Sequence, residues 1–385
     1  WLGFYERFWT DRLDVLDRLL REEDDAPHPE GDGAVMTQTP ERAATSTSGG
    51  ARIVDFLDAV QRKVQERAST LPTVAALIIF VAMIVYGEIA YGRIVQFSTL
   101  SNLLINNAHL VILAVGLTFV ILTGGIDLSV GAIIAFSSVA GVMLSNAGWN
   151  PYVVILLMIL IGSAMGLASG ILIQYFNVQP FIATLAMMFL ARGLASMLST
   201  VPERLGDDSA IRAFATQWKI IDGPKVNDLV VTPGVLIAAI VVAIGFFVLH
   251  RTRTGRTVYA IGGSEQSAEL MGLPVHVTKL WIYVISGTLA GIASVVYTSR
   301  LGIAQNITGI GWELDAIAAV VIGGTLLTGG AGYVLGSVVG ALVLGLMNVL
   351  ITRDGGIRPE MTTIITGSIL FIFVMLQRGV IGRGR

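Results

Sequence analysis

Residues 108–131 read AHLVILAVGLTFVILTGGIDLSVG, and this stretch indicates a chain that lies in a membrane. An apolar run ends at the paired glycines Gly124 and Gly125, and a second apolar run begins after Asp127. Further runs of this kind fill most of the chain, and each is close to the length of a membrane-spanning helix. The runs lie at about 72–91, 108–123, 126–144, 152–173, 181–199, 232–249, 281–298, 314–329, 333–351 and 361–376. We therefore predict an all-α polytopic membrane protein with about ten transmembrane helices.

The composition agrees with a membrane protein and excludes several other classes. Of the 385 residues, 54% are hydrophobic and 14% are charged, whereas soluble domains carry about 25% charged residues. The chain has no cysteine, which excludes disulfides, zinc–thiolate sites and cysteine nucleophiles. Its net charge of −2 argues against binding to nucleic acid.

The paired glycines occur twice. Residues 122–131 (LTGGIDLSVG) and residues 327–336 (LTGGAGYVLG) agree at five of ten positions. Each copy stands between two apolar runs, so spans 1–4 and 7–10 are predicted to form a parallel internal repeat of the kind found in transporters. The alternative is that glycine-rich turns recur by chance, since 44 residues are glycine. The candidate hinge residues are Gly124, Gly125, Asp127, Gly329 and Gly330. We expect Asp127 to cap the helix of span 3, and the alternative places it at the inner gate.

The first 71 residues differ from the rest. Residues 1–35 contain ten acidic and four basic residues, and the first methionine is Met36. We expect Met36 to be the start of the native protein, although a genuine acidic tail is the rival interpretation. Residues 1–51 are predicted to be an acidic, disordered extension. Residues 52–71 are predicted to form an amphipathic lead-in helix at the membrane surface or a simple polar lead-in, and residues 72–380 the transmembrane domain.

The distribution of Lys and Arg gives an orientation. With the N-terminus inside, eleven basic residues flank the spans on the inner side and eight on the outer side. The positive-inside rule therefore places both termini in the cytoplasm.

No motif for an energy-converting or hydrolytic reaction is present in the sequence. It lacks a G-x-x-x-x-G-K-[ST] phosphate loop, an H-E-x-x-H metal site and a G-x-S-x-G nucleophile elbow. We therefore expect no enzymatic activity, and no cofactor or metal bound by this chain.

The loop 250–280 carries a short predicted helix. Ser264 is a suitable N-cap, Glu265 suits the positive end of a helix, and Gly272 followed by Pro274 ends it. The helix would span about 265–271, and it would either dock in a groove of a partner or be an ordinary solvated loop helix. The candidate docking residues are Gly262, Gly263, Ser264, Glu265, Glu269, Leu270, Met271 and Gly272.

Polar residues near the outer ends of spans are the candidates for a substrate pathway. Asn106 and Asn107 can both donate and accept hydrogen bonds, as sugar hydroxyls require, or can merely mark the membrane boundary. Arg192 lies within span 5, where an unpaired guanidinium is costly, and Glu313 and Asp315 begin span 8. We expect Arg192 to pair with one of these carboxylates, in an architectural or a gating role.

Three motifs carry a resemblance to a known family. LTGGIDLSVG, YAIGGSEQSAELMGLPV and GWELDAIAAVVIGGTLLTGGAGYVLGSVVGAL resemble, in this order, the permease subunits of bacterial ribose-type sugar ABC importers. The resemblance covers about residues 72–380. HRTRTGRTVYAIGG and the ending LFIFVMLQRG look most like the second permease of galactofuranose importers.

The resemblance implies an importer of several parts. A cytoplasmic ABC ATPase would use ATP and Mg, an extracytoplasmic protein would bind the sugar, and a second permease subunit would complete the path in the bacterial inner membrane. The helix at 264–272 would be the coupling helix that the ATPase receives. The alternatives are an ABC permease for branched-chain amino acids or nucleosides and a stand-alone secondary transporter.

Overall fold

The computed structural model describes residues 71–206, 209–221 and 227–354, together with 361, 364–368, 371 and 375. The predicted extension 1–51 and, apart from its last residue, the lead-in segment 52–71 lie outside the described residues. The described part of the chain consists of helices joined by short connections and two pairs of short strands.

Seven helices of the described residues are long and apolar enough to cross a membrane. They are α3 (Leu71–Tyr91), α4 (Phe97–Leu122), α6 (Pro151–Gln174), α7 (Pro180–Leu198), α8 (Pro233–Arg251), α11 (Val275–Leu301) and α13 (Val334–Asp354). Proline occupies the first turn of α6, α7 and α8, where its missing N–H has no helical partner to lose. These helices confirm the prediction of an all-α polytopic membrane protein.

Two predicted spans are shorter than expected. α5 (Val130–Asn146) has 17 residues, and α12 (Trp312–Ile322) has 11 residues, so α12 is roughly 16 Å long, about half of the hydrocarbon core. The chain is extended before α5, where Asp127 binds Ser129. After α12, Gly324 has a positive φ of 97° and stops the helix. The tenth predicted span, 361–376, is described only in part.

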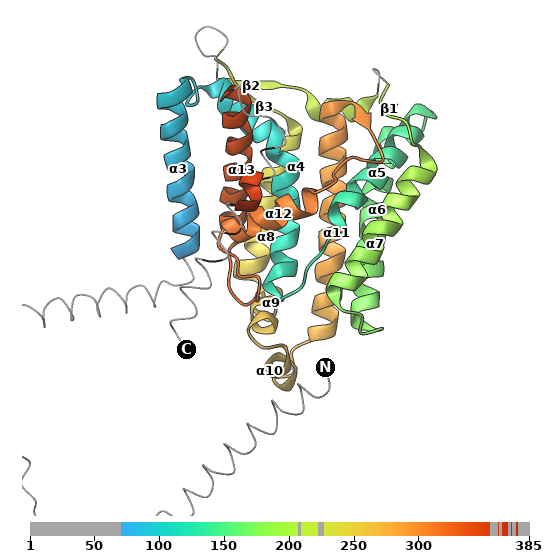
Figure 1. The fold of residues 1–385 in the computed structure, drawn as a ribbon. Coiled ribbons are helices and arrows are strands. Elements are labelled where there is room, and N and C mark those ends of the chain that lie inside the picture. Colours follow the sequence, from blue (N-terminus) through green and yellow to red (C-terminus); the bar gives the residue numbers. More distant parts are fainter. Residues whose placement is uncertain are drawn as a thin grey trace, which may run out of the picture. The chain divides into compact units, whose positions relative to one another are not determined.

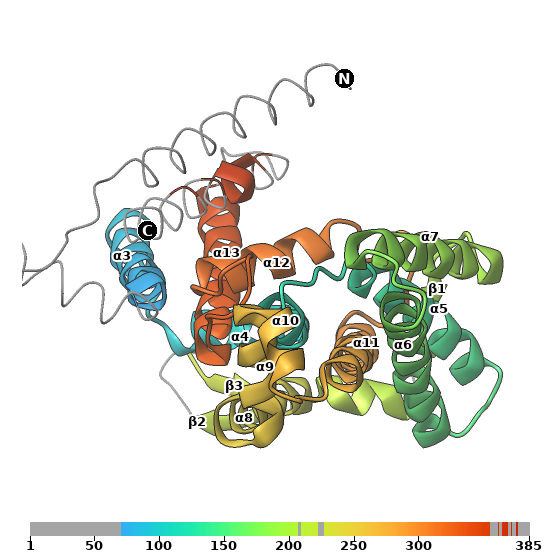
Figure 2. The ribbon, with the colours of Figure 1, turned by 90° about the horizontal axis from the view of Figure 1, so that it is seen from below.

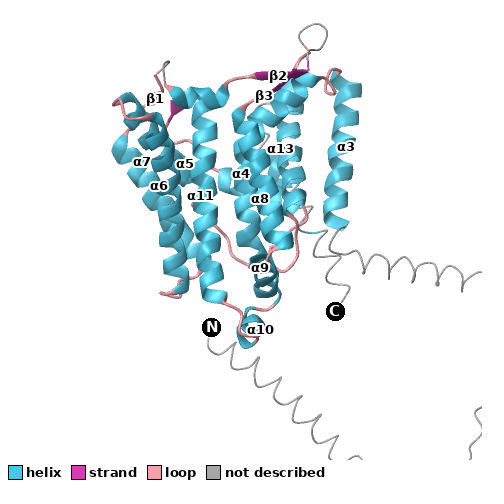
Figure 3. Cartoon of the chain, turned by 180° about the vertical axis from the view of Figure 1, so that it is seen from behind, coloured by secondary structure: helices cyan, strands magenta, loops and turns pink. Residues whose placement is uncertain are grey.

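The long helices run between two ends, and the connections at the two ends contain different elements, as Figures 1 and 3 show. One end, called the α10 end below, carries α9 (Arg253–Gly263) and α10 (Glu265–Leu270). The other, called the strand end, carries the 3-10 helix η1 (Ala210–Ala215) and the antiparallel pairs β1 (Glu203–Arg204) with β4 (Ile303–Ala304) and β2 (Trp218–Ile221) with β3 (Leu229–Val231). α12 runs obliquely between α7 and α13 (Figure 2).

The two LTGG turns, residues 122–125 and 327–330, lie together at the α10 end. The Gly330 amide donates to the carbonyl of Leu122 at 2.9 Å. The first turn joins α4 to α5 and the second joins α12 to α13, so both copies of the repeat have the same orientation, as the sequence predicts.

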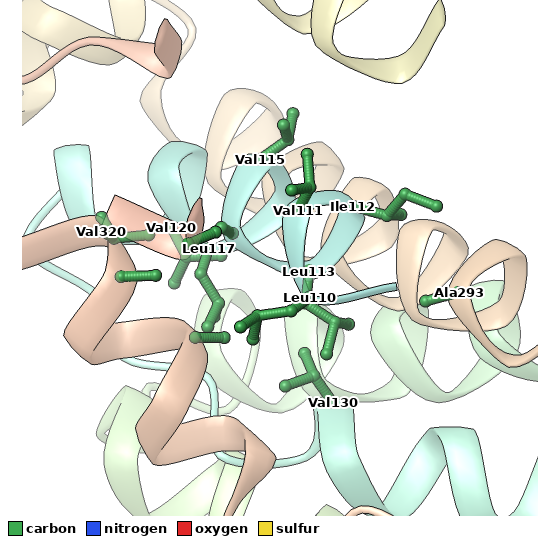
Figure 4. Packing of buried hydrophobic residues seen from close by; sticks show 14 of the residues in the cluster. Leu110, Val111, Ile112, Leu113, Val115, Leu117, Val120, Val130, Ala293 and Val320 are labelled. Atoms are coloured by element: carbon green, nitrogen blue, oxygen red, sulfur yellow. The ribbon is translucent and has the colours of Figure 1, made fainter. Parts of the chain in front are cut away.

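The hydrophobic core is built around α4. Eighteen of its residues are buried, whereas most of α3 is exposed. Figure 4 shows Leu117 and Val120 of α4 beside Val320 of α12, with Ala293 of α11 on the opposite side of α4. α4 is therefore the central helix, and its neighbours α11, α12 and α13 are positioned by it.

Glycines bring α6 and α11 into backbone contact. A Cβ at Gly291 of α11 would lie 2.8 Å from the Cα of Ile159, and one at Gly287 would lie 2.9 Å from the amide nitrogen of Gly166. Small residues are the usual way for helices to approach closely in lipid. α6 and α11 are therefore packed tightly together through their backbones on one side of α4.

Candidate functional site

A cavity of about 590 Å³ lies between α4, α12 and α13. It includes Thr99 at the start of α4 and Arg353 at the end of α13, which places it toward the strand end. Its polar lining comes mainly from amides and three ionisable groups. These residues are Asn102, Asn106, Asn107, His109, Asp315, Asn348 and Arg353.

The structure brings together three of the five residues predicted for the substrate pathway. Asn106, Asn107 and Asp315 all line the cavity, whereas Arg192 and Glu313 do not. Asn102 and Asn106 are four residues apart, so they lie on the same face of α4.

The amides suit a ligand with many hydroxyl groups. Asn102, Asn106 and Asn348 are exposed, and each side chain offers both donors and an acceptor. Asn107 is buried and donates from Nδ2 to the carbonyl of Leu103 at 2.7 Å, so it forms part of the wall. It fits there because Gly345 of α13 has no side chain, and a Cβ at that position would overlap the amide.

Aromatic rings close one side of the cavity. The centroids of His109 and Trp312 lie 4.5 Å apart, and Tyr297 of α11 packs edge-on against Trp312 at 4.7 Å. Together with the amides, they give the cavity a mixed polar and aromatic lining.

Sequence reasoning missed the contribution of α13. Asn348, Thr352 and Arg353 all line the cavity. The spacing of Asn348 and Thr352, four residues apart at the end of an apolar run, is a signal that indicates a polar face. Arg353 donates from Nη1 to the carbonyl of Gly92 at 2.9 Å and from Nη2 to Thr99 Oγ1 at 3.1 Å, which ties α13 to the α3–α4 connection.

The predicted ion pair of Arg192 is wrong. Within the described residues, neither Glu313 nor Asp315 lies within ion-pair distance of its guanidinium. Arg192 Nη1 instead donates to the carbonyls of Asn306 (2.7 Å) and Thr308 (2.5 Å) in the α11–α12 connection. Backbone carbonyls that no helix or strand satisfies are good partners for a guanidinium in a membrane, because both groups gain a hydrogen bond.

Glu313 belongs to the first turn of α12, and its carboxylate lies against the start of α5 rather than in the cavity. Its Oε2 atom is buried and has no hydrogen-bond partner. A Cβ at Gly131, in the first turn of α5, would lie 2.6 Å from this oxygen. The positive end of the α5 dipole favours a negative charge at this place.

Asp127 lies directly before α5, where it accepts hydrogen bonds from a backbone amide at the start of the helix and from two hydroxyl groups. Its Oδ1 accepts from the amide of Ser129 at 2.9 Å and from the hydroxyl of Ser129 at 2.6 Å. Its Oδ2 accepts from Ser286 Oγ of α11 at 2.7 Å. The carboxylate is buried and therefore fixes the extended segment before α5 to α11.

The loop 250–280 contains the predicted short helix. α10 spans Glu265–Leu270, Ser264 accepts from the amide of Ser267 at 3.2 Å, and Gly272 has a φ of 74°. Leu270 and Met271 are 84% and 67% exposed, so the helix presents apolar side chains outward.

Two further contacts fix α10 on its inner side. Lys279 of α11 forms an ion pair with Glu265 at 2.6 Å. Ala268 is buried against Ile261 of α9 and Val275 of α11. Glu269 lies 3.8 Å from His276 on the exposed side.

The remaining predicted residues meet where α9 ends. A Cβ at Gly262 would overlap the carbonyl oxygen of Leu122 and the amide nitrogen of Gly330, so both LTGG turns touch the backbone of α9. Gly124, Gly329 and Gly330 have φ values of 74°, 85° and 78°, a conformation that favours glycine. Gly125 is enclosed too, because a Cβ there would lie 2.5 Å from the hydroxyl of Tyr283. Gly263, one residue beyond Gly262, faces open space.

Tyr259 adds a side-chain tether to this region. Its hydroxyl donates to the carbonyl of Gly332 at 2.6 Å. Burial raises the pKa of Tyr259 to about 12, so the hydroxyl keeps its proton at neutral pH.

Comparison with known proteins identifies the family. Residues 99–375 match the family described as branched-chain amino acid transport system / permease component. The chain is 53% identical over 315 residues to the fructose import permease protein FruG of Bifidobacterium longum, an alignment that covers 82% of this chain and 92% of that protein. It is 40% identical over 310 residues to the inner membrane ABC transporter permease protein YjfF of Escherichia coli (80% and 92% covered).

A third relative is the ribose import permease protein RbsC of Escherichia coli, with 37% identity over 251 residues and 65% and 77% of the two chains covered. No solved structure gives a significant match to the chain. The family match and the identity to FruG over most of both chains show that this protein belongs to the permease-component family of the branched-chain amino acid transport system type.

Proposed function

We propose that this chain is the membrane-spanning subunit of an ATP-binding-cassette importer that moves a monosaccharide into the cell. The observation that carries the proposal is the 53% identity to FruG, a fructose import permease, over 92% of that protein's length. The identity to RbsC, a ribose import permease, points to the same class of substrate.

The cavity supports a neutral, hydroxyl-rich substrate. Three exposed asparagines face it, and Trp312 offers an aromatic surface. A sugar hydroxyl both donates and accepts hydrogen bonds, and so does a carboxamide. An amino acid would instead require an acid for its amino group and a base for its carboxylate. Asp315 is the acid of the cavity, and the base Arg353 is already hydrogen-bonded to Gly92 and Thr99, which favours a neutral substrate.

Separate ATPase subunits supply the energy in this proposal. The sequence has no phosphate-binding loop. α10 presents Leu270 and Met271 at the end of the molecule opposite the strands, which suits docking in a groove of an ATPase that binds ATP and Mg. An extracytoplasmic sugar-binding protein and a second permease subunit, identical or different, complete the importer.

The α10 end is the cytoplasmic end in this proposal. The excess of Lys and Arg on that side supports the orientation. Because the chain has no cysteine, a single cysteine at Met271 or at Trp149 can be labelled without background. Both residues are at least half exposed. We expect an impermeant maleimide to label Trp149→Cys in intact cells and to label Met271→Cys only after permeabilisation.

Reconstituted transport tests the function directly. The chain is reconstituted in liposomes with the ATPase, binding protein and second permease encoded beside its gene, and uptake of labelled fructose, ribose and galactofuranose is measured. We expect ATP-dependent uptake of one of these sugars, with no competition by leucine or adenosine. ATP-dependent uptake of leucine or adenosine would show a different cargo. Sugar uptake driven by an ion gradient, by this chain alone, would show a secondary transporter.

A pair of variants at neighbouring positions of α4 tests the cavity. Asn106→Leu removes an amide that faces the cavity, and Ile105→Leu changes a side chain that does not line it. Losing a hydrogen bond to the substrate costs about 0.5–1.5 kcal/mol, so the KM of Asn106→Leu is expected to rise by roughly two- to tenfold. The KM of Ile105→Leu is expected to match that of the wild type. Equal KM values for both variants would show that the cavity is not part of the substrate pathway.

A further inference from the structure

Three backbone segments meet at Gly262. They are the last turn of α9, the first LTGG turn and the second LTGG turn. The two turns are bonded to each other through the Gly330 amide and the Leu122 carbonyl at 2.9 Å. Gly330 Cα lies 2.9 Å from the place that a Cβ of Gly262 would take. These contacts involve main-chain atoms, which cannot rotate aside as side chains do.

α9 and α10 are joined as one rigid piece. Ser264 is both the C-cap of α9, donating its amide to Ala260 at 3.1 Å, and the N-cap of α10. Ile261 and Ala268, one from each helix, are buried together. A displacement of α10 therefore displaces the last turn of α9, which contains Gly262.

The two turns connect to the helices that form the cavity. The first turn follows α4 directly, and the second lies between α12 and α13. These three helices provide the cavity lining, from Thr99 to Arg353. Tyr259, one turn before Gly262, holds the segment that follows the second turn through its hydrogen bond to Gly332.

We propose that Gly262 transmits movement of α10 to both LTGG turns at once, and through them to the walls of the cavity. The inference rests on the proposed function, in which a partner ATPase moves α10. Gly262 is a positioning residue in this scheme: it touches neither nucleotide nor sugar, and it acts because the absence of a side chain lets three backbones touch.

Two helical glycines provide a matched test. Gly262→Ala places a methyl group against Leu122 and Gly330, whereas Gly193→Ala, in α7 and outside the docking region, places one in open space. The readout is the number of sugar molecules transported per ATP hydrolysed in the reconstituted importer. We expect this ratio to fall by about tenfold or more in Gly262→Ala, within the usual range of coupling between distant sites, and to stay at the wild-type value in Gly193→Ala.

The outcomes separate the inference from the function on which it rests. Absence of sugar-stimulated ATP hydrolysis in the wild-type complex contradicts the proposed function. Normal coupling in the wild type and in Gly262→Ala overturns the inference alone, as does an equal loss in both alanine variants.

A distance measurement covers the case in which Gly262→Ala does not assemble. Spin labels are placed on Gln266→Cys of α10 and Thr328→Cys of the second turn, both exposed positions in a chain without native cysteine. A second pair joins Thr328→Cys to Trp149→Cys at the strand end. On addition of ATP to the wild-type background complex, we expect the first distance to stay constant and the second to change. A change in the first distance, or none in the second, overturns the inference.

Discussion

Replacing Gly291 by alanine tests the tight contact between α6 and α11. The new Cβ would lie 2.8 Å from the Cα of Ile159 and 2.9 Å from the carbonyl oxygen of Met158. Carbon atoms in favourable contact are about 3.5–4.0 Å apart, so the two helices must separate locally by roughly 1 Å. Both neighbouring atoms belong to the backbone, which means that a side-chain rotation cannot relieve the overlap.

The magnitude follows from two opposing effects. Overpacking of a well-packed interface costs about 1–3 kcal/mol, and replacing glycine by alanine within a helix returns about 0.5–1 kcal/mol. We therefore expect Gly291→Ala to lower the stability of the folded chain by up to roughly 2.5 kcal/mol.

Gly193→Ala in α7 is the matched control. A Cβ there meets no atom within 4 Å, so only the gain in helix propensity remains and the variant is expected to be slightly more stable than the wild type. The difference between the two alanine variants isolates the overpacking.

The assay is thermal unfolding of both variants and the wild type in one detergent at one heating rate, because membrane proteins of this size unfold irreversibly and the midpoint depends on the rate. We expect the order Gly291→Ala, wild type, Gly193→Ala, from lowest to highest midpoint. A midpoint for Gly291→Ala at or above that of Gly193→Ala would refute the packing argument.

Three further predictions concern single side chains. Arg192→Met removes the nitrogen that donates to two carbonyls, so sugar uptake is expected to fall, whereas Arg253→Met at an exposed position of α9 is expected to have no effect. Ser264→Ala removes the cap of α10 at a cost of about 0.5–2 kcal/mol, which hydrogen exchange of residues 265–271 will show as faster exchange than in Ser267→Ala. The raised pKa of Tyr259 means that its hydroxyl contributes fully to stability below the unfolded value near 10 and loses that contribution as the pH rises through about 12. Thermal midpoints between pH 8 and 9 should therefore differ by a constant amount between wild type and Tyr259→Phe, and a difference that varies across this range would contradict the assignment.

Local signals in the sequence predicted the α10 region well. Ser264, Gly272 and Pro274 act on residues within a few positions of themselves, and the structure has the cap, the left-handed glycine and the end of the helix as expected. The repeated LTGG motif could also be recognised from the sequence, because Gly124 and the equivalent Gly329 both have a positive φ, a conformation that favours glycine.

Contacts between distant segments were not readable in the same way. Asn348 and Arg353 meet Asn102 and Asp315 in the cavity only because α4, α12 and α13 pack together. Arg192 donates to backbone carbonyls, and every residue of the chain has a carbonyl, so the sequence does not show which of them it binds. The prediction considered only acidic side chains as partners and was therefore wrong. The short length of α12 also depends on tertiary structure, since an apolar run of 314–329 permits a longer helix.

The position of α3 has a consequence for adaptation to different lipids. With 21 residues it is roughly 32 Å long, close to the thickness of a bilayer interior. Within the described residues its contacts are mainly with α13. Hydrogen bonds hold both of its ends, from Thr73 Oγ1 to the carbonyl of Gly323 at 2.9 Å and from the Tyr91 hydroxyl to Asp354 at 2.8 Å. When hydrophobic thickness changes, α3 is therefore expected to tilt together with α13 rather than alone. A mismatch with the lipid then reaches a helix that lines the cavity, and transport is expected to depend on the depth of the membrane.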